Sequence, residues 1–418
     1  MGVPKLRFKA DDGSDFPNWE EKTLGELCEP LTYGMNAAAT KFDGENRYIR
    51  ITDIDDETHA FLSNDVVSPS GELDDKYLVK KGDILLARTG ASTGKSYLYH
   101  PKDGKLFYAG FLIKAHVLPS SDDYFIYSQT LTDRYGKWVK TTSMRSGQPG
   151  INANEYASYS FSVPSLPEQR KIAGLLSTVD DVIAAQEAEV AAWEKRKKGV
   201  MQKLFSQEVR FKADDGSDFP DWEEKTLGDL GYFIRGLSYN KTQVLDDGSD
   251  ASGTAVLRSN NINSDGTLDY RDDVQLVSKE PFSEQQLCEN DVVICMANGS
   301  NRLVGKAARY DGGYDARRIT VGAFCGIFRT DSPLVPWWFQ SDDYKSFLHL
   351  SKQGGDGALA NLKGKDIEAI SLLFPSSSTE QREIADCLAS LDEVIAKAKD
   401  ELDAWRELKK GLLQQMFV

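Results

Sequence analysis

The chain has 418 residues, of which 50 are Lys or Arg and 65 are Asp or Glu, so its formal net charge is −15. A hydrophobic share of 40% can fill more than one core and excludes disorder throughout. No apolar run approaches the roughly 20 residues of a membrane-spanning helix, and five widely spaced cysteines with four histidines exclude a zinc finger or ribbon and argue against a disulfide framework.

The first predicted element is an opening segment that recurs later in the chain. Residues 7–27 (RFKADDGSDFPNWEEKTLGEL) and residues 210–230 (RFKADDGSDFPDWEEKTLGDL) match at 19 of 21 positions, at an offset of 203. Such self-similarity indicates that one structural unit is present twice.

Two dissimilar segments, 28–163 and 231–374, follow these openers. Both contain short runs bounded by Gly, Asp and Asn, which are typical of strands. The predicted strands are 48–54, 83–88, 111–118, 255–262 and 291–297. Two short matches indicate a shared fold with diverged surfaces: Lys81-Gly82-Asp83 with Glu289-Asn290-Asp291, and Gly94-Lys95 with Gly305-Lys306.

A long helix is predicted after each variable segment. Residues 168–205 and 380–417 align at an offset of 212, and a seam of mostly apolar residues recurs at steps of four and three over 172–204 and 384–416. This period of 3.5 residues is typical of a coiled coil. The length of the seams favours an antiparallel pair within the chain over helices that each pack only on their own domain. Three polar residues interrupt the seams: Gln186, Lys197 and Lys409.

The predicted fold is α+β, with a pseudo-two-fold internal repeat in which two strand-rich domains are joined by two long helices that form an antiparallel coiled coil. The predicted parts are a first strand-rich domain at 1–163, a first helix at 164–206, a second domain at 207–374 and a second helix at 375–418. Because near-identical segments surround dissimilar ones, we expect the two domains to carry separate specificities.

The segment TGASTGKS at 89–96 is similar to a phosphate-binding loop but lacks its spacing. That loop has four residues between its glycines, whereas three separate Gly90 from Gly94 and five separate Gly299 from Gly305. The sequence contains no glycine pattern of a dinucleotide-binding domain and no HExxH or GxSxG motif. These absences favour a binding protein over a catalyst.

Positive charge is concentrated in the same half of each variable segment. The net charge is +7 over 76–154 and +4 over 297–330, which leaves −26 on the rest of the chain. Basic residues interleaved with Tyr, Trp, Gly and Ser suit contacts with phosphates and base edges. A solvated face that balances nearby acids is the alternative interpretation.

The repeated segments resemble the conserved regions of the specificity subunits of type I restriction–modification systems. Residues 168–183 (EQRKIAGLLSTVDDVI) and 192–205 (AWEKRKKGVMQKLF), with their second copies, resemble the family's central and distal regions. The openers ending in WEEKTLGEL and WEEKTLGDL resemble the start of its target-recognition domains, and 146–170 and 355–382 resemble its junctions between domain and helix. The likeness spans the chain in the family's order, although Ser376–Thr379 replaces the usual proline-rich lead into the helix.

This resemblance implies a DNA-reading subunit without chemistry of its own. Each target-recognition domain would contact one half of a bipartite site in double-stranded DNA, and the helix pair would set the distance between the halves. The implied partners are two modification subunits, which use S-adenosylmethionine to methylate a flipped adenine, and restriction subunits driven by ATP. The chain itself would hold no cofactor and no metal, and would act in the cytoplasm away from membranes. The outer helix faces would dock the partners, for example through Glu187, Glu189, Glu194, Asp400, Glu401 and Asp403.

The family's DNA contacts come from loops of the recognition domains, so the candidates are basic and polar loop residues. In the first domain they are Arg88, Lys95, Lys137, Lys140, Arg145 and Gln148. In the second domain they are Asn298, Arg302, Lys306, Arg317, Arg318 and Lys363.

The sequence is compatible with three other functions. A nucleotide-binding enzyme would bind ATP or S-adenosylmethionine by itself. A pure scaffold would explain the acidic total but would leave the two basic concentrations without a role. A related system, in which one partner fuses methylation and cleavage, would use the same kind of chain.

Overall fold

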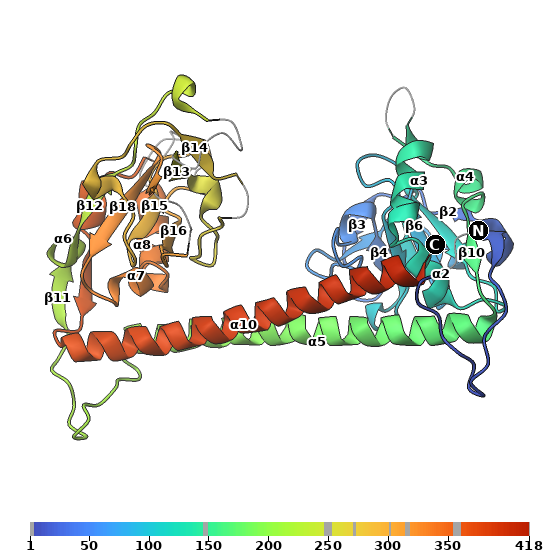
Figure 1. Ribbon diagram of the computed structural model, residues 1–418, viewed down its shortest axis with the longest axis horizontal. Helices are drawn as coiled ribbons and strands as arrows, with labels where there is room; N and C mark the ends of the chain where they lie inside the picture. The colour runs from blue at the N-terminus through green and yellow to red at the C-terminus, as the bar shows by residue number, and fades with distance from the viewer. Residues whose placement is uncertain are drawn as a thin grey trace. The chain divides into compact units, whose positions relative to one another are not determined.

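The computed structural model describes residues 4–144, 149–245, 253–270, 273–300, 302–313, 318–353 and 361–417, and of 351–353 only the backbone. The chain forms two compact units: the first contains Met1–Ala188 and Lys399–Val418, and the second contains Glu189–Ala398. Each unit therefore combines one strand-rich domain with parts of both long helices (Figure 1).

The strand-rich part of the first unit is built around a four-stranded antiparallel sheet. Its strands are β1 (Glu20–Thr23), β2 (Thr32–Tyr33), β3 (Ala39–Lys41), β4 (Arg47–Ile49), β5 (Val67–Pro69), β6 (Asp83–Ala87), β7 (Ser96–Leu98), β8 (Leu106–Tyr108), β9 (Leu112–His116) and β10 (Ser160–Val163). Its short helices are α1 (Leu24–Leu27), α2 (Asp123–Gln129), α3 (Asp133–Ser143) and α4 (Ala153–Ala157), with 3-10 turns η1 (Ile51–Asp53), η2 (Asp75–Tyr77) and η3 (Pro101–Asp103). The main sheet has the order β2-β9-β6-β7, and the pairs β1-β10, β3-β5 and the parallel β4-β8 complete the set.

The second unit repeats this plan. Its strands are β11 (Glu223–Thr226), β12 (Gly231–Arg235), β13 (Thr254–Leu257), β14 (Gln275–Val277), β15 (Val292–Cys295), β16 (Ala307–Arg309), β17 (Ile319–Val321), β18 (Cys325–Thr330) and β19 (Ser371–Phe374). Its short helices are α6 (Leu227–Leu230), α7 (Val335–Trp338), α8 (Asp342–Gln353) and α9 (Gly364–Glu368), with η4 (Lys241–Gln243), η5 (Ser259–Asn261) and η6 (Ser283–Gln285). The main sheet, β12-β18-β15-β16, matches the strand order of the first unit.

Three predicted strands are confirmed and two are corrected. The segments 83–88, 111–118 and 291–297 contain β6, β9 and β15. The strands predicted at 48–54 and 255–262 end early and continue as the 3-10 turns η1 and η5. In each turn a side chain binds the backbone three residues before it, which competes with strand pairing. These contacts are Arg50 N–H to Asp53 at 2.8 Å and Arg258 N–H to Asn261 at 2.9 Å.

The two long helices, α5 (Leu166–Phe205) and α10 (Ser378–Met416), pair in antiparallel fashion within each unit. In the first unit Asp180 pairs with Lys409, and Glu187 pairs with Arg406. A higher residue number in α5 thus faces a lower residue number in α10, which shows that the helices run in opposite directions. Every residue of the two predicted seams is buried or half-buried. The α+β fold and its coiled-coil pairing are therefore confirmed. Among the described residues, no helix is both long and apolar enough to cross a membrane.

The polar interruptions of the seams are paired with acids of the opposite helix. Lys409 Nζ lies 2.6 Å from Asp180 Oδ1, and Lys197 Nζ lies 2.6 Å from Asp392 Oδ1. These two ion pairs occupy equivalent places in the two repeats. Both lysines are largely buried, with 21% and 11% of their side chains exposed. Each ion pair therefore neutralises a charge that would otherwise interrupt the apolar seam without a partner.

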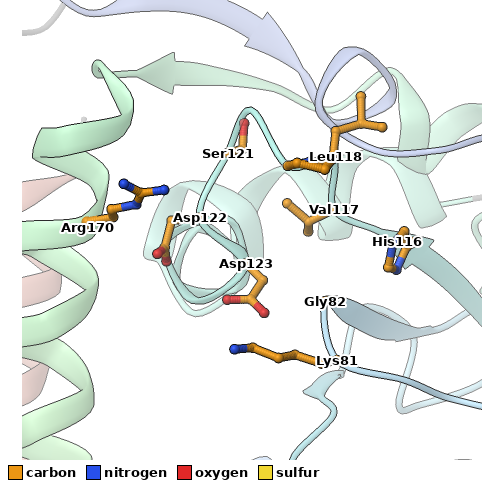
Figure 2. A pocket seen from close by; sticks show the side chains of 10 residues that line it. Lys81, Gly82, His116, Val117, Leu118, Ser121, Asp122, Asp123 and Arg170 are labelled. Carbon is orange, nitrogen blue, oxygen red and sulfur yellow. The ribbon is translucent and has the colours of Figure 1, made fainter.

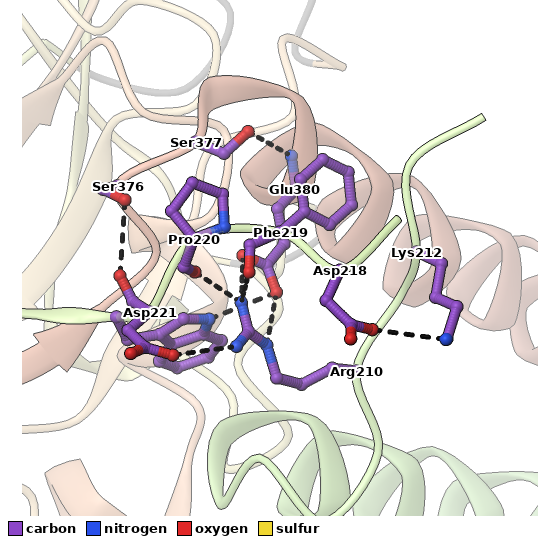
Figure 3. Close-up of polar contacts among 10 residues, drawn as sticks. Arg210, Lys212, Asp218, Phe219, Pro220, Asp221, Ser376, Ser377 and Glu380 are labelled. Atoms are coloured by element: carbon purple, nitrogen blue, oxygen red, sulfur yellow. Dashed lines mark hydrogen bonds and ion pairs between the residues drawn. The ribbon is translucent and has the colours of Figure 1, made fainter. Parts of the chain in front are cut away.

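Each opener is fastened to the first turn of the long helix in its unit. Figure 3 shows Arg210 beside Glu380, whose side chain is fully buried. Two guanidinium nitrogens of Arg210 each donate to the Glu380 carboxylate at 3.0 Å, and Trp222 Nε1 donates to it at 3.2 Å. The same contact in the first unit joins Arg7, Glu168 and Trp19. A buried carboxylate requires such donors, which explains why both openers carry the same Arg and Trp.

Both helices contribute to the core of each unit. In the first unit the core takes Ile172 and Leu176 from the start of α5, and Met416 from the end of α10. In the second unit the roles are exchanged, with Leu204 from the end of α5 and Ile384 from the start of α10. Each strand-rich domain is thus completed by the end of a helix that belongs to the other repeat.

Candidate nucleic-acid interface

Some of the candidate DNA-contacting residues lie at one end of the central strands. β6 continues into the loop 88–95 that leads to β7, and β15 continues into the loop 296–306 that leads to β16. Five candidates lie on these loops: Arg88, Lys95, Asn298, Arg302 and Lys306. Loops that leave a rigid sheet can present several side chains to one ligand.

Arg88 directly follows β6 and lies beside the segment that leads into α4. The Ile151 N–H donates to Arg88 O at 2.9 Å. The guanidinium carbon of Arg88 lies 4.8 Å from the ring centroid of Tyr33, which is 43% exposed. Stacking on a ring orients the plane of the guanidinium, which suits a planar acceptor such as a guanine edge.

Asn298 and Lys363 lie close together in the second unit. Asn298 Nδ2 donates to Ser259 Oγ at 2.8 Å, which orients its amide on the loop. The Leu362 N–H donates to Met296 O at 3.0 Å, so Lys363, at the start of α9, lies beside that loop. Lys363 is exposed, as a phosphate contact requires.

Lys95 and Lys306 instead point into their own domains. Lys95 Nζ donates to Ile54 O at 2.9 Å, forms an ion pair with Asp56, and leaves only 10% of its side chain exposed. Lys306 Nζ makes the equivalent contact with Ile262 O at 3.4 Å. The short sequence match around these lysines therefore marks a shared support of the loop after η1 or η5. A DNA contact by either lysine remains a prediction.

The helix α3 presents Lys137 and Lys140 on its exposed side. Its other side packs on the β6–β7 loop, where the Tyr135 hydroxyl donates to Gly94 O at 2.9 Å and Val139 fills the space that a Cβ at Gly94 would need. Burial raises the pKa of Tyr135 well above its usual value, so the hydroxyl keeps its proton as a donor. The two lysines are thus held beside the loop of Arg88 by a buried contact.

The remaining candidates differ in what they contact. Arg302 is exposed on the β15–β16 loop, whereas Arg318 forms an ion pair with Glu280 at 2.8 Å. Arg145, Gln148 and Arg317 lie outside the residues that the structure describes.

Two exposed phenylalanines border the same surfaces and were not among the candidates. Phe111 follows β8 and is 63% exposed, and Phe324 follows β17 and is 72% exposed. The Arg88 N–H donates to Phe111 O at 3.0 Å, and the Met296 N–H donates to Phe324 O at 2.8 Å. A search for basic and polar residues does not find them. In the sequence, only the equivalent position of the two phenylalanines in otherwise dissimilar segments could have indicated them.

A pocket of about 300 Å³ lies at the opposite end of β6 (Figure 2). Its lining mixes Lys81 and Arg170 with Asp122 and Asp123, so its charges oppose one another. It also includes His116, whose Nδ1 lies 2.7 Å from the buried Asp83. Burial raises the pKa of Asp83. The pocket is separated from Arg88 by the length of the strand and is no part of the candidate interface.

Metal chemistry finds no support in the described part of the chain. There, no group of three or more His, Cys, Asp or Glu side chains is placed to hold a metal ion.

Comparisons with known proteins all lead to the same family. Residues 17–192 match the family model described as the type I restriction modification DNA specificity domain. Over 98% of this chain and 95% of the relative, the sequence is 23% identical to a protein of Methanocaldococcus jannaschii assigned as the MjaX specificity subunit of a type I restriction enzyme. This chain is therefore similar to the type I restriction–modification specificity subunits. Over 47% of this chain and 41% of the relative, it is also 28% identical to the EcoKI specificity subunit of Escherichia coli K12.

Solved structures of specificity subunits share the fold over the whole chain. The S subunit from M. genitalium covers 100% of this chain and 99% of its own, with a TM-score of 0.59 at 18% identity. A chain from a study of complex assembly and conformational transition in the type I system covers 96% and 97%, with a TM-score of 0.52 at 18% identity. These likenesses extend the comparison to the second unit, beyond the residues matched by the family model.

Proposed function

We propose that the chain is the DNA specificity subunit of a type I restriction–modification complex and that each strand-rich domain reads one half of a bipartite site. The observation that carries this proposal is the repeat of one sheet, β2-β9-β6-β7 and β12-β18-β15-β16, whose central strands end in loops of different sequence. A shared scaffold with different loops suits the reading of two unlike half-sites by one chain. The chain has no chemistry of its own in this proposal.

The paired helices suit the role of a spacer between the half-sites. α5 has 40 residues, which corresponds to about 60 Å at 1.5 Å per residue. Half-sites read from one side of DNA are separated by about 34 Å or a multiple of it. A helix of this length is therefore long enough to span such a separation.

The proposed partners are two modification subunits, which carry S-adenosylmethionine, and restriction subunits, which use ATP. The chain itself holds neither cofactor, and the complex acts in the cytoplasm. We expect the modification subunits to dock on acidic outer positions of the helices. Five of these side chains are exposed: Glu189, Glu194, Asp400, Glu401 and Asp403. The sixth, Glu187, is partly engaged by Arg406 at 2.8 Å.

The proposal is tested by mapping DNA methylation in a host without other adenine methylation. The chain is expressed with the modification gene from its own locus, and methylated adenines are located by single-molecule sequencing. We expect one methylated motif in two parts separated by a gap of fixed length. Replacing residues 231–374 with the matching segment of another specificity subunit should change one part of the motif and leave the other unchanged.

Two other results would point to other functions. A complex that assembles but methylates no motif would favour a scaffold. Binding of S-adenosylmethionine or ATP by the isolated chain in calorimetry would favour an enzyme. If the motif is found, the domain architecture of the partner decides between a type I system and a related system with a fused methyltransferase and nuclease.

A further inference from the structure

We propose that Phe111 and Phe324 are aromatic contacts on DNA, one for each half-site, which stack against bases without reading their identity. The inference rests on the proposed DNA-reading function and adds two residues that charge and motif analysis did not select. It is carried by the equivalent placement of the two rings, by the rigidity of the turns that present them, and by the side chains around them.

The two phenylalanines occupy the same position of the same turn. In the first unit the Leu112 N–H donates to Ala109 O at 2.8 Å, which closes a four-residue turn with Phe111 in third place. In the second unit the Cys325 N–H donates to Gly322 O, also at 2.8 Å, with Phe324 in third place. Single exposed apolar residues are common on protein surfaces. Two that coincide at 63% and 72% exposure in otherwise diverged loops indicate a shared function.

A glycine directly after the neighbouring strand, β2 or β12, holds each turn in place. The Gly34 N–H donates to Leu112 O at 3.1 Å, and the Gly236 N–H donates to Cys325 O at 3.2 Å. A Cβ at either glycine would overlap a carbonyl group of the turn, so the close approach requires glycine. A ring on a backbone that is fixed in this way loses little conformational freedom when it binds.

The side chains next to the rings differ between the two units. In the first unit the second residue after Phe111 is Ile113, which pairs with Tyr33 of the neighbouring strand. In the second unit the second residue after Phe324 is Gly326, which pairs with Arg235. The residue after the central strand is Arg88 in the first unit and a methionine in the second. Variable neighbours suit the reading of different bases, whereas a constant ring suits stacking, because every base has an aromatic face.

Cationic groups near the rings favour DNA over a protein as the partner. In the first unit Arg88 stacks on the ring of Tyr33 and donates its backbone N–H to Phe111 O. In the second unit Arg235 is exposed and lies on β12, which pairs with β18, the strand that follows Phe324. An aromatic ring beside a guanidinium matches a base next to its phosphate. Phenylalanine is also a residue that proteins insert between base steps to unstack them.

The test uses the complex of this chain with its modification subunits and duplexes that contain the mapped motif. Phe111→Ala and Phe324→Ala should each weaken binding by about 10- to 100-fold, while the relative affinity for single-base changes in the half-site stays within about twofold. Phe→Trp at either position should retain most of the affinity, and Phe→Leu should not. A duplex with 2-aminopurine at the contacted step should show a fluorescence change that Phe→Ala removes.

Phe282→Ala is the matched control, because Phe282 is 74% exposed and the first unit has Asp74 at the equivalent place. It should bind DNA as the unaltered chain does. Wild-type affinity in both Phe→Ala variants would overturn the inference. Variants that fail to assemble with the modification subunits would show that the rings are protein contacts, which also overturns it. If the unaltered complex binds no duplex specifically, the proposed function itself fails.

Discussion

At the scale of single residues, the direction of a side chain decides which basic groups can meet DNA. Lys95 lies in the most basic part of the sequence, yet its ammonium group binds the carbonyl of Ile54 and the carboxylate of Asp56. Arg302, Lys137 and Lys140 are exposed on the same end of their domains. The basic residues that are concentrated in the sequence therefore have two different roles: some support a loop, and others are free to contact a ligand.

These roles predict opposite behaviour for Arg302→Ala and Lys95→Met. Arg302→Ala should weaken specific DNA binding by about 1–3 kcal/mol if the guanidinium reads a base, and should leave the melting temperature unchanged. Lys95→Met removes a charged hydrogen bond to a buried carbonyl and should lower the free energy of unfolding by about 1–2 kcal/mol. Fluorescence anisotropy with the cognate duplex and thermal unfolding measure the two effects. A loss below about 0.3 kcal/mol of binding in folded Arg302→Ala would remove that residue from the interface.

At the scale of elements, the long helices are paired by reciprocal contacts. Lys197 pairs with Asp392 in the second unit at the positions equivalent to Lys409 and Asp180 in the first, so each apolar seam contains one ion pair. Lys197 also lies 5.0 Å from the ring centroid of Trp337. A polar pair within an apolar seam penalises other registers, because a shift of either helix would leave a buried charge without its partner.

Removal of one partner of this pair should destabilise the second unit. Lys197→Met leaves Asp392 next to an apolar seam without its cation, and we expect a loss of about 1–3 kcal/mol in the free energy of unfolding. The double variant Lys197→Met with Asp392→Leu should recover part of this loss, because neither charge then remains. Urea unfolding of all three variants gives the coupling energy. Lys410→Ala is the control, since Lys410 is 64% exposed and should change stability by less than about 0.5 kcal/mol. A coupling energy of zero would contradict the role of the pair.

At the scale of the whole molecule, the two ends of the chain meet within the first unit (Figure 1). The Leu6 N–H donates to Gln415 O at 3.1 Å. The equivalent residues of the second unit, Val209 and Lys203, form the same contact at 3.2 Å. In the second unit this contact lies on a continuous chain, and in the first it joins the two ends. The ends of the chain in the first unit therefore take the places that a continuous segment takes in the second unit.

A circular permutant should keep the fold and the specificity. Direct fusion of residue 418 to residue 1 places six residues between Phe417 and Leu6, whereas three separate Phe205 from Val209. With new ends between Gln207 and Glu208, the permutant should melt within a few degrees of the original and methylate the same motif in the complex. A permutant opened inside β6 should not fold. If the first permutant does not fold, the continuous backbone between α5 and the second opener is itself required for folding.

The sequence alone determined the repeat, the 3.5-residue period of both helices and the strands β6, β9 and β15, because these features depend on residues that are near one another in the chain or identical between copies. It also placed Arg88, Asn298, Arg302 and Lys363 in the candidate site. The tertiary structure decided which lysines point inward, and it placed Phe111 and Phe324 on the surface. It also decided that the end of α10 completes the first unit. Those outcomes depend on contacts across long separations, such as Arg7 with Glu168 at 161 residues, which no local pattern contains.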